Sequence, residues 1–199
     1  MAGIVETWYE FRAKTALHSR VKGLGPSEKD PDGLARKKRG HFGGVRVLHF
    51  EWTGTASPPD LLPVSRGAEL ISRRMLDRLI RAGIRGLGEL SVALKLPDST
   101  VADYSLLVVS REVDSICFRR SEHSVGPATK LYALRDPVIT GLNAESSDAY
   151  VLPYDLAMHS VIVSTRFMEI AQRSDMSNVE FIPVGKLEVM LPDPDQVLC

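Results

Sequence analysis

Arginine is the residue type in this chain whose placement most clearly indicates a chemical role. Six arginines fall in one short stretch of sequence: Arg66, Arg73, Arg74, Arg78, Arg81 and Arg85. A guanidinium group donates paired hydrogen bonds to carboxylates and phosphates, so these residues could form a cationic face for an acidic protein or a phosphate backbone. The solvated outer face of an amphipathic helix gives the same pattern. We take Arg74, Arg78 and Arg81 as candidate partner-binding residues.

A second candidate contact region lies ahead of the last apolar stretches of the chain. The segment from Asp148 to Asp155 carries Tyr150, Pro153 and Tyr154. Aromatic side chains on an ordered loop often anchor protein–protein interfaces. The same side chains could instead cover the hydrophobic core, and the sequence leaves both alternatives open. Tyr150 and Tyr154 are therefore also candidate partner-binding residues.

The sequence carries no recognisable catalytic or metal-binding pattern. Cys117 and His123 could pair as nucleophile and base, but Cys117 lies in a β-branched stretch typical of core residues. The histidines lack the spacing of metal ligands, and neither phosphate-loop pattern, GxxxxGKS/T nor GxGxxG, occurs. We therefore predict no catalytic residue, no metal site, no cofactor and no enzyme activity.

Composition and charge limit the class of partner. The chain has 199 residues, of which 44% are hydrophobic, and its 25 basic residues balance 25 acidic ones. A dedicated nucleic-acid binder usually has a basic excess, so nucleic acid is disfavoured as a partner. No apolar run approaches the roughly 20 residues of a membrane helix, and the start of the chain does not have the pattern of a secretory signal. We expect a cytoplasmic protein that does not bind membranes.

Periodicity predicts strands and a long loop in the first part of the chain. Residues 4–12 and 45–53 alternate between apolar and polar positions, as strands with one buried face do. In the second of these strands, Leu48 and Phe50 lie on the apolar face. Residues 22–44 are dense in Gly, Pro and charge, and we expect them to form a flexible loop.

Two segments resemble each other at an offset of 92 residues. Residues 67–96 and 159–190 each have the pattern of a strand, a serine N-cap, a short helix and a second strand, with Ser72 aligned to Ser164. Other aligned pairs are Arg74 with Arg166, Arg81 with Arg173, Met75 with Phe167, and Gly86 with Asn178. These units predict an α+β fold with a mixed or antiparallel sheet. We expect a single domain over 1–199, which could consist of two packed pseudo-repeat halves, 1–100 and 101–199.

The C-terminal unit also resembles a known group of proteins. Its apolar strand at 161–163, its Ser164, its helix starting with Arg166 and Phe167, and its closing VEFIPV at 179–184 resemble the end of bacterial immunity proteins. Those proteins protect producers from their own polymorphic or contact-delivered toxins. The earlier segment ISRRMLDRLIRAGIRGL is similar to a unit of a related family named for a double CxxCG motif, whose cysteines are absent here. The resemblance implies an α+β protein that binds and blocks a cognate toxin. Because the CxxCG cysteines are absent, it implies no metal-binding role.

Three functions remain open at this point, and we favour the first. The chain could be a cytoplasmic immunity protein that acts in bacterial competition by stoichiometric binding of a cognate toxin. Alternatively, it could bind nucleic acid or a phosphate ligand through the arginine-rich helix and the basic run at 36–39. An enzyme centred on Cys117 or a histidine is the third alternative. The sequence does not predict the oligomeric state.

Overall fold

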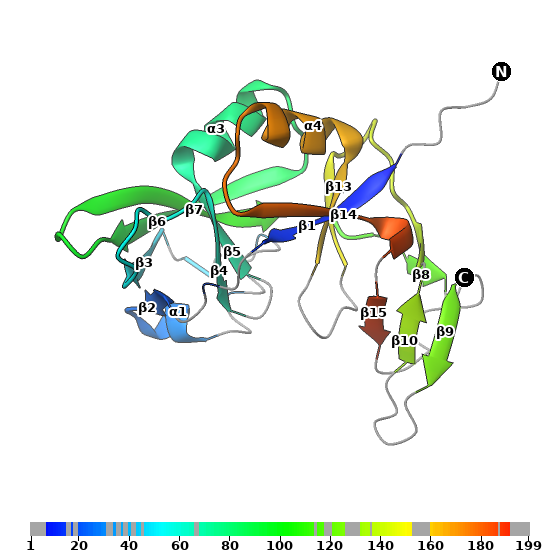
Figure 1. The fold of residues 1–199 in the computed structure, drawn as a ribbon, viewed down its shortest axis with the longest axis horizontal. Helices are drawn as coiled ribbons and strands as arrows, with labels where there is room; N and C mark the ends of the chain where they lie inside the picture. Colours follow the sequence, from blue (N-terminus) through cyan, green and yellow to red (C-terminus); the bar gives the residue numbers. More distant parts are fainter. Residues whose placement is uncertain are drawn as a thin grey trace.

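The computed structural model of the chain shows an α+β protein, which confirms the fold class expected from the sequence (Figure 1). It describes residues 7–14, 17, 20–30, 34, 37, 40, 43–44, 46–65, 68–113, 115–117, 121–125, 132–135, 137–152, 160–186 and 188–191. Two main helices, α3 (Arg73–Arg81) and α4 (Thr165–Arg173), lie side by side against the sheets. Two shorter helical turns are α1 (Pro26–Lys29) and η3 (Val184–Lys186).

The larger sheet is mixed and has six strands in the order β2-β3-β6-β7-β5-β4. Its strands are β2 (Val21–Gly23), β3 (Val47–Trp52), β4 (Leu61–Ser65), β5 (Ala68–Ser72), β6 (Leu87–Lys95) and β7 (Val101–Val109). Within this sheet β3 runs parallel to β6, and the other neighbouring pairs are antiparallel. It packs against α3, which follows β5 directly in the chain.

A second, antiparallel sheet lies against α4 and has the order β12-β13-β1-β14. Its strands are β1 (Trp8–Ala13), β12 (Ala149–Val151), β13 (Val161–Ser164) and β14 (Val179–Pro183). Two small antiparallel sheets complete the described part of the chain. They are formed by β8 (Ser115–Cys117) with β11 (Val138–Thr140), and by β9 (Glu122–Val125), β10 (Tyr132–Arg135) and β15 (Glu188–Leu191).

The predicted strand at 45–53 is confirmed as β3, and its apolar face is buried. Leu48 and Phe50 are fully enclosed in the core of the larger sheet, whereas His49 between them is exposed. Part of the segment 22–44 is more regular than the loop we expected. Its start belongs to β2, and α1 follows, where Pro26 occupies the first turn and Glu28 accepts a hydrogen bond from the His49 amide at 2.8 Å. The remaining residues of that segment lie largely outside the described ones.

The main hydrophobic core joins both helices to both large sheets. From α3 it takes Met75, Leu76 and Leu79, and from α4 it takes Phe167. The ring of Phe11, from β1, meets Phe167 edge-on at 5.1 Å between centroids. Because one continuous core lies under α3 and α4, the two helices are held at a fixed place relative to each other.

The two main helices have the same local construction. Each helix has nine residues and is capped by a serine whose Oγ accepts a backbone N–H three residues later, from Met75 to Ser72 and from Phe167 to Ser164. In the turns that follow, Gly86 and Asn178 both adopt positive φ, 87° and 60°. That conformation is accessible to glycine and tolerated by asparagine, which explains the pairing of these residue types.

The strand pairings around the two helices also correspond. Leu61 of β4 pairs with Ile71 of β5, and Ala149 of β12 pairs with Val163 of β13 in the same register relative to each helix. In each large sheet, one strand between the two strands of a unit comes from the other half of the chain. β7, from the second half, lies between β5 and β6, whereas β1, from the first half, lies between β13 and β14. Common origin of the units stays a prediction, but this exchange joins the halves in one hydrogen-bonded framework.

Candidate functional site

The surface formed by α3 and α4 brings together arginines from both ends of the chain. Arg166, at the start of α4, donates a hydrogen bond to the Ala82 carbonyl at the end of α3 at 2.6 Å. Arg78, within α3, donates to the Ser174 carbonyl at the end of α4 at 3.1 Å. Each helix therefore satisfies a carbonyl at the end of the other, which the last turn of a helix leaves unpaired. This pairing favours the close packing of the two helices.

We call the exposed cations of this surface the arginine face. Positions i, i+4 and i+7 lie on one side of a helix, so the face follows one side of α3 and the equivalent side of α4. Its members are Arg74, Arg78, Arg81, Arg166 and Arg173. The side chains of Arg81 and Arg173 are 78% and 76% exposed. Both are more exposed than Arg74 and Arg166, whose side chains are 56% and 48% exposed.

A buried carboxylate, Asp60, holds Arg74, the second residue of α3. Its side chain is 6% exposed and accepts hydrogen bonds from Ser72 Oγ at 2.5 Å and from Arg74 Nη2 at 2.9 and 2.8 Å. The Ser177 amide and hydroxyl, beyond the end of α4, donate to its Oδ2 at 3.0 and 2.9 Å. Burial acts to raise the pKa of Asp60, but these hydrogen bonds outweigh it and lower the pKa below its ordinary value. The ionised Asp60 in turn raises the pKa of Arg74.

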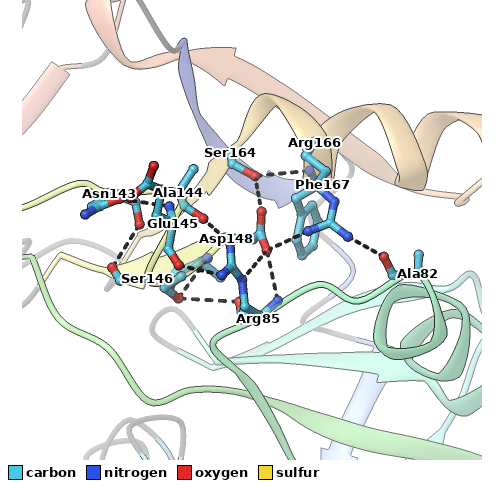
Figure 2. A network of polar contacts seen from close by, with 12 residues as sticks. Ala82, Arg85, Asn143, Ala144, Glu145, Ser146, Asp148, Ser164, Arg166 and Phe167 are labelled. Atoms are coloured by element: carbon cyan, nitrogen blue, oxygen red, sulfur yellow. Dashed lines mark hydrogen bonds and ion pairs between the residues drawn. The ribbon is translucent and has the colours of Figure 1, made fainter.

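Asp148 has the corresponding place at the start of α4 (Figure 2). Its side chain is 1% exposed and accepts hydrogen bonds from Ser164 Oγ at 2.9 Å and from the Arg85 amide at 3.0 Å. The guanidinium groups of Arg85 and Arg166 each come within 3.7 Å of its Oδ2. Each buried carboxylate therefore joins the N-cap of one helix to the loop that follows the other helix.

Arg85 extends this network to the loop that precedes β12 (Figure 2). Its guanidinium donates to the carbonyl oxygens of Ala144 and Glu145. The next residue, Gly86, passes so close to Ser147 that a Cβ atom at Gly86 would lie 1.9 Å from the Ser147 hydroxyl. The requirement for glycine here is therefore steric as well as conformational.

The structure gives the five sequence-predicted contact residues different environments. Arg74 and Arg78 are exposed but make the intramolecular contacts described above, and the Arg81 side chain is 78% exposed. Tyr150 is 3% exposed, its ring packs edge-on against Trp8 at 5.6 Å, and its hydroxyl donates to the Asn143 carbonyl. These contacts match the core-covering alternative for Tyr150. Tyr154 lies outside the described residues.

Other candidate chemistry from the sequence can be placed only in part. Cys117 is buried at the end of β8, so a substrate would not reach its side chain in this structure. Among the residues that the structure describes, no group of three or more His, Cys, Asp or Glu side chains is arranged to hold a metal ion. None of the helices in the described ranges has the length and hydropathy that a bilayer crossing requires.

Sequence reasoning did not single out the two buried carboxylates. A signal was present, because Asp60 and Asp148 each precede a short apolar segment, LL and AYVL, that leads into one of the aligned units. Arg166 aligns with Arg74 in the sequence but is not among the predicted site residues. The contact of each arginine with a carboxylate depends on the pairing of β4 with β5 and of β12 with β13, which the alignment does not specify.

Comparison with known proteins gives one family match. The family model described as "Immunity protein family (Imm11)" matches residues 11–186. The matched range contains both main helices, both buried carboxylates and the whole arginine face. No curated protein matches the chain. The match confirms the resemblance to immunity proteins that the C-terminal unit indicated in the sequence.

Proposed function

The chain belongs to the immunity protein family Imm11, and from this we propose that it neutralises a cognate bacterial toxin by stoichiometric protein–protein binding. The family match from residue 11 to residue 186 is the observation that carries the proposal. Inhibition of this kind needs only that the immunity protein cover the toxin's active cleft or hold the toxin in an inactive conformation. It requires no catalytic step by the chain itself. The complex would form in the cytoplasm of the cell that produces both proteins.

We propose the α3 members of the arginine face, Arg74, Arg78 and Arg81, as the main contact with the toxin. Exposed charges increase the association rate of complementary proteins, whereas a few well-held anchor residues determine how long the complex lasts. Arg81 is suited to the first role because its side chain is 78% exposed. Arg74 and Arg78 are suited to the second, because intramolecular hydrogen bonds already orient their guanidinium groups. From the aromatic segment, Tyr154 remains a candidate contact, whereas Tyr150 would need to leave its buried position.

The alternative function, binding of nucleic acid or a phosphate ligand, uses the same arginines. Several of them are already paired with carboxylates, Arg74 with Asp60 and Arg173 with Glu169 among them. The formal net charge of the chain is zero. Both facts weaken the electrostatic attraction to a phosphate backbone, on which sequence-independent binding of nucleic acid depends.

The proposal is tested by affinity purification of the tagged chain from its native host, followed by mass spectrometry of the bound proteins. We expect a partner with a toxic domain, recovered at a one-to-one ratio after a wash in high salt. Light scattering of the purified complex would measure the ratio. Recovery of nucleic acid alone, released by salt, would instead support the alternative function.

A further inference from the structure

The two helices α3 and α4 contain more basic than acidic residues, unlike the chain as a whole. α3 and α4 together contain six arginines, Arg73, Arg74, Arg78, Arg81, Arg166 and Arg173, and two acidic residues, Asp77 and Glu169. The whole chain, by contrast, has equal numbers of basic and acidic residues. Within these two helices, basic residues therefore outnumber acidic ones.

We infer that the arginine face is one continuous docking surface across α3 and α4, and that its occupant is an acidic segment of the toxin. The inference rests on the proposed function and deepens it, because it adds the α4 arginines to the contact surface and states the chemistry of the partner. Each helix contributes an inner arginine near its N-cap and an outer arginine near its end. The inner pair is Arg74 and Arg166, and the outer pair is Arg81 and Arg173.

The inner arginines are held in place before any partner arrives. Arg74 donates to both carboxylate oxygens of Asp60 through one nitrogen, and the remaining donors of its guanidinium are not used by these bonds. Arg166 donates to the Ala82 carbonyl and lies 3.7 Å from the Asp148 carboxylate. A group oriented in this way loses little conformational entropy when it binds a further carboxylate.

The outer arginines are exposed and only weakly engaged. Arg81 lies 3.9 Å from Asp77, and Arg173 lies 2.9 Å from Glu169, in both cases across one helical turn. Ion pairs of this exposed kind contribute little to stability, so a carboxylate from outside can replace or join the internal one at low cost. The surface thus combines fixed inner cations with available outer cations, an arrangement that suits a partner with several carboxylates.

Charge reversal of the outer arginines tests the inference without disturbing the buried carboxylates. The test variant is Arg81→Glu with Arg173→Glu. The matched control is Lys95→Glu with Lys186→Glu, which changes the net charge equally at exposed residues outside the two helices. Each protein is produced in a strain of the native host that lacks the gene, and that strain is challenged with native host cells as the source of toxin. Thermal unfolding of each variant, compared with wild type, verifies that it is folded.

We expect the wild-type chain and the lysine control to protect the challenged strain, and the arginine variant to lower its survival at least about tenfold. Affinity for the toxin domain recovered by purification should fall in parallel, and its dependence on salt should weaken. Equal protection by the folded arginine variant would overturn the inference while leaving the proposed function intact. Failure of the wild-type chain to protect would instead refute the proposed function. A further result against the inference would be loss of binding to a DNA duplex probe with unchanged affinity for the toxin.

Discussion

Asp60 and Asp148 occupy equivalent places beside α3 and α4, yet they bind their neighbours differently. Asp60 accepts direct hydrogen bonds from Arg74 and from both polar groups of Ser177, and its surroundings are partly open to solvent. Asp148 is more deeply enclosed, and its arginines approach at 3.7 Å while their guanidinium groups donate elsewhere. The first carboxylate orients a surface arginine, and the second mainly holds the Ser164 hydroxyl and the Arg85 amide in place.

This difference separates two contributions to stability. If the number of hydrogen bonds decides the cost of losing a carboxylate, Asp60 is the more important residue. If burial decides the cost, Asp148 is the more important residue, because donors left without an acceptor inside a protein cannot form hydrogen bonds with water instead. The donors to Asp148 include Ser164 Oγ, on a fully buried residue, whereas Arg74 and Ser177 at Asp60 are exposed. We therefore expect burial to dominate.

The largest effect is expected for Asp148→Ala. Removal of this carboxylate leaves Ser164 Oγ and the Arg85 amide without their acceptor, and it leaves two guanidinium groups without a nearby counter-charge. We predict a loss of about 3 kcal/mol in the free energy of unfolding, measured by urea denaturation. A loss below that of Asp60→Ala would show that burial is not the deciding factor.

Asp60→Ala should cost less, about 2 kcal/mol, because Arg74 and Ser177 can be hydrated after the change. The same substitution should also free the Arg74 guanidinium, which the carboxylate holds at 2.8 Å. Toxin affinity should therefore fall together with stability in Asp60→Ala. Asp148→Ala, by contrast, should lose more stability than Asp60→Ala. Its loss of toxin affinity should be smaller in proportion to the stability that it loses. Urea denaturation and calorimetric titration of both variants would check this contrast.

The cap serines provide a smaller and more local comparison. Ser164→Ala should lower the free energy of unfolding by about 2 kcal/mol, and Ser72→Ala by about 1 kcal/mol. Both substitutions remove an N-cap hydrogen bond, to Phe167 and to Met75, but Ser164 is fully buried and Ser72 is only partly so. Thermal unfolding of the two variants side by side would measure the difference. Equal costs would mean that the cap alone matters.

The smallest expected effect is the pH dependence that Asp60 confers. Hydrogen bonds from Ser72, Ser177 and Arg74 lower its pKa in the folded protein below the ordinary value of 3.8, despite burial. The carboxylate therefore stabilises the fold at pH values above 3.8, and this contribution is lost as the pH falls through the lowered pKa. The stability advantage of wild type over Asp60→Asn should shrink as the pH is lowered below about 4. An advantage that stays constant down to about pH 2 would contradict the assignment.

The α+β class and the helical units could be predicted from sequence because they depend on local signals. The serine caps at Ser72 and Ser164 and the apolar spacing of each helix are such signals, and both helices form where they indicate. The alternation of apolar residues around Leu48 and Phe50 likewise specified which face of β3 is buried. Such patterns depend on periodicity alone, so they do not require knowledge of the partners in space.

The candidate site could be predicted only in part, because its contacts join residues far apart in the chain. Asp60 binds Ser177, and Asp148 binds Arg85, across loops that periodicity does not connect. The exchange of β1 and β7 between the sheets is equally non-local. Tyr150 shows how far sequence can place a single residue. Its residue type and position suited a surface anchor as well as the buried place that it occupies.

Neutralisation of a toxin by binding is tested most directly by the growth of cells that make the toxin domain recovered by purification. Growth is compared with and without co-production of the chain. Neutralisation by binding predicts that the wild-type chain restores growth. It also predicts that folded Arg81→Glu with Arg173→Glu does not restore growth, while the lysine control does. If the wild-type chain, produced in molar excess over the toxin domain, does not restore growth, the central claim that this protein protects by binding a toxin is contradicted.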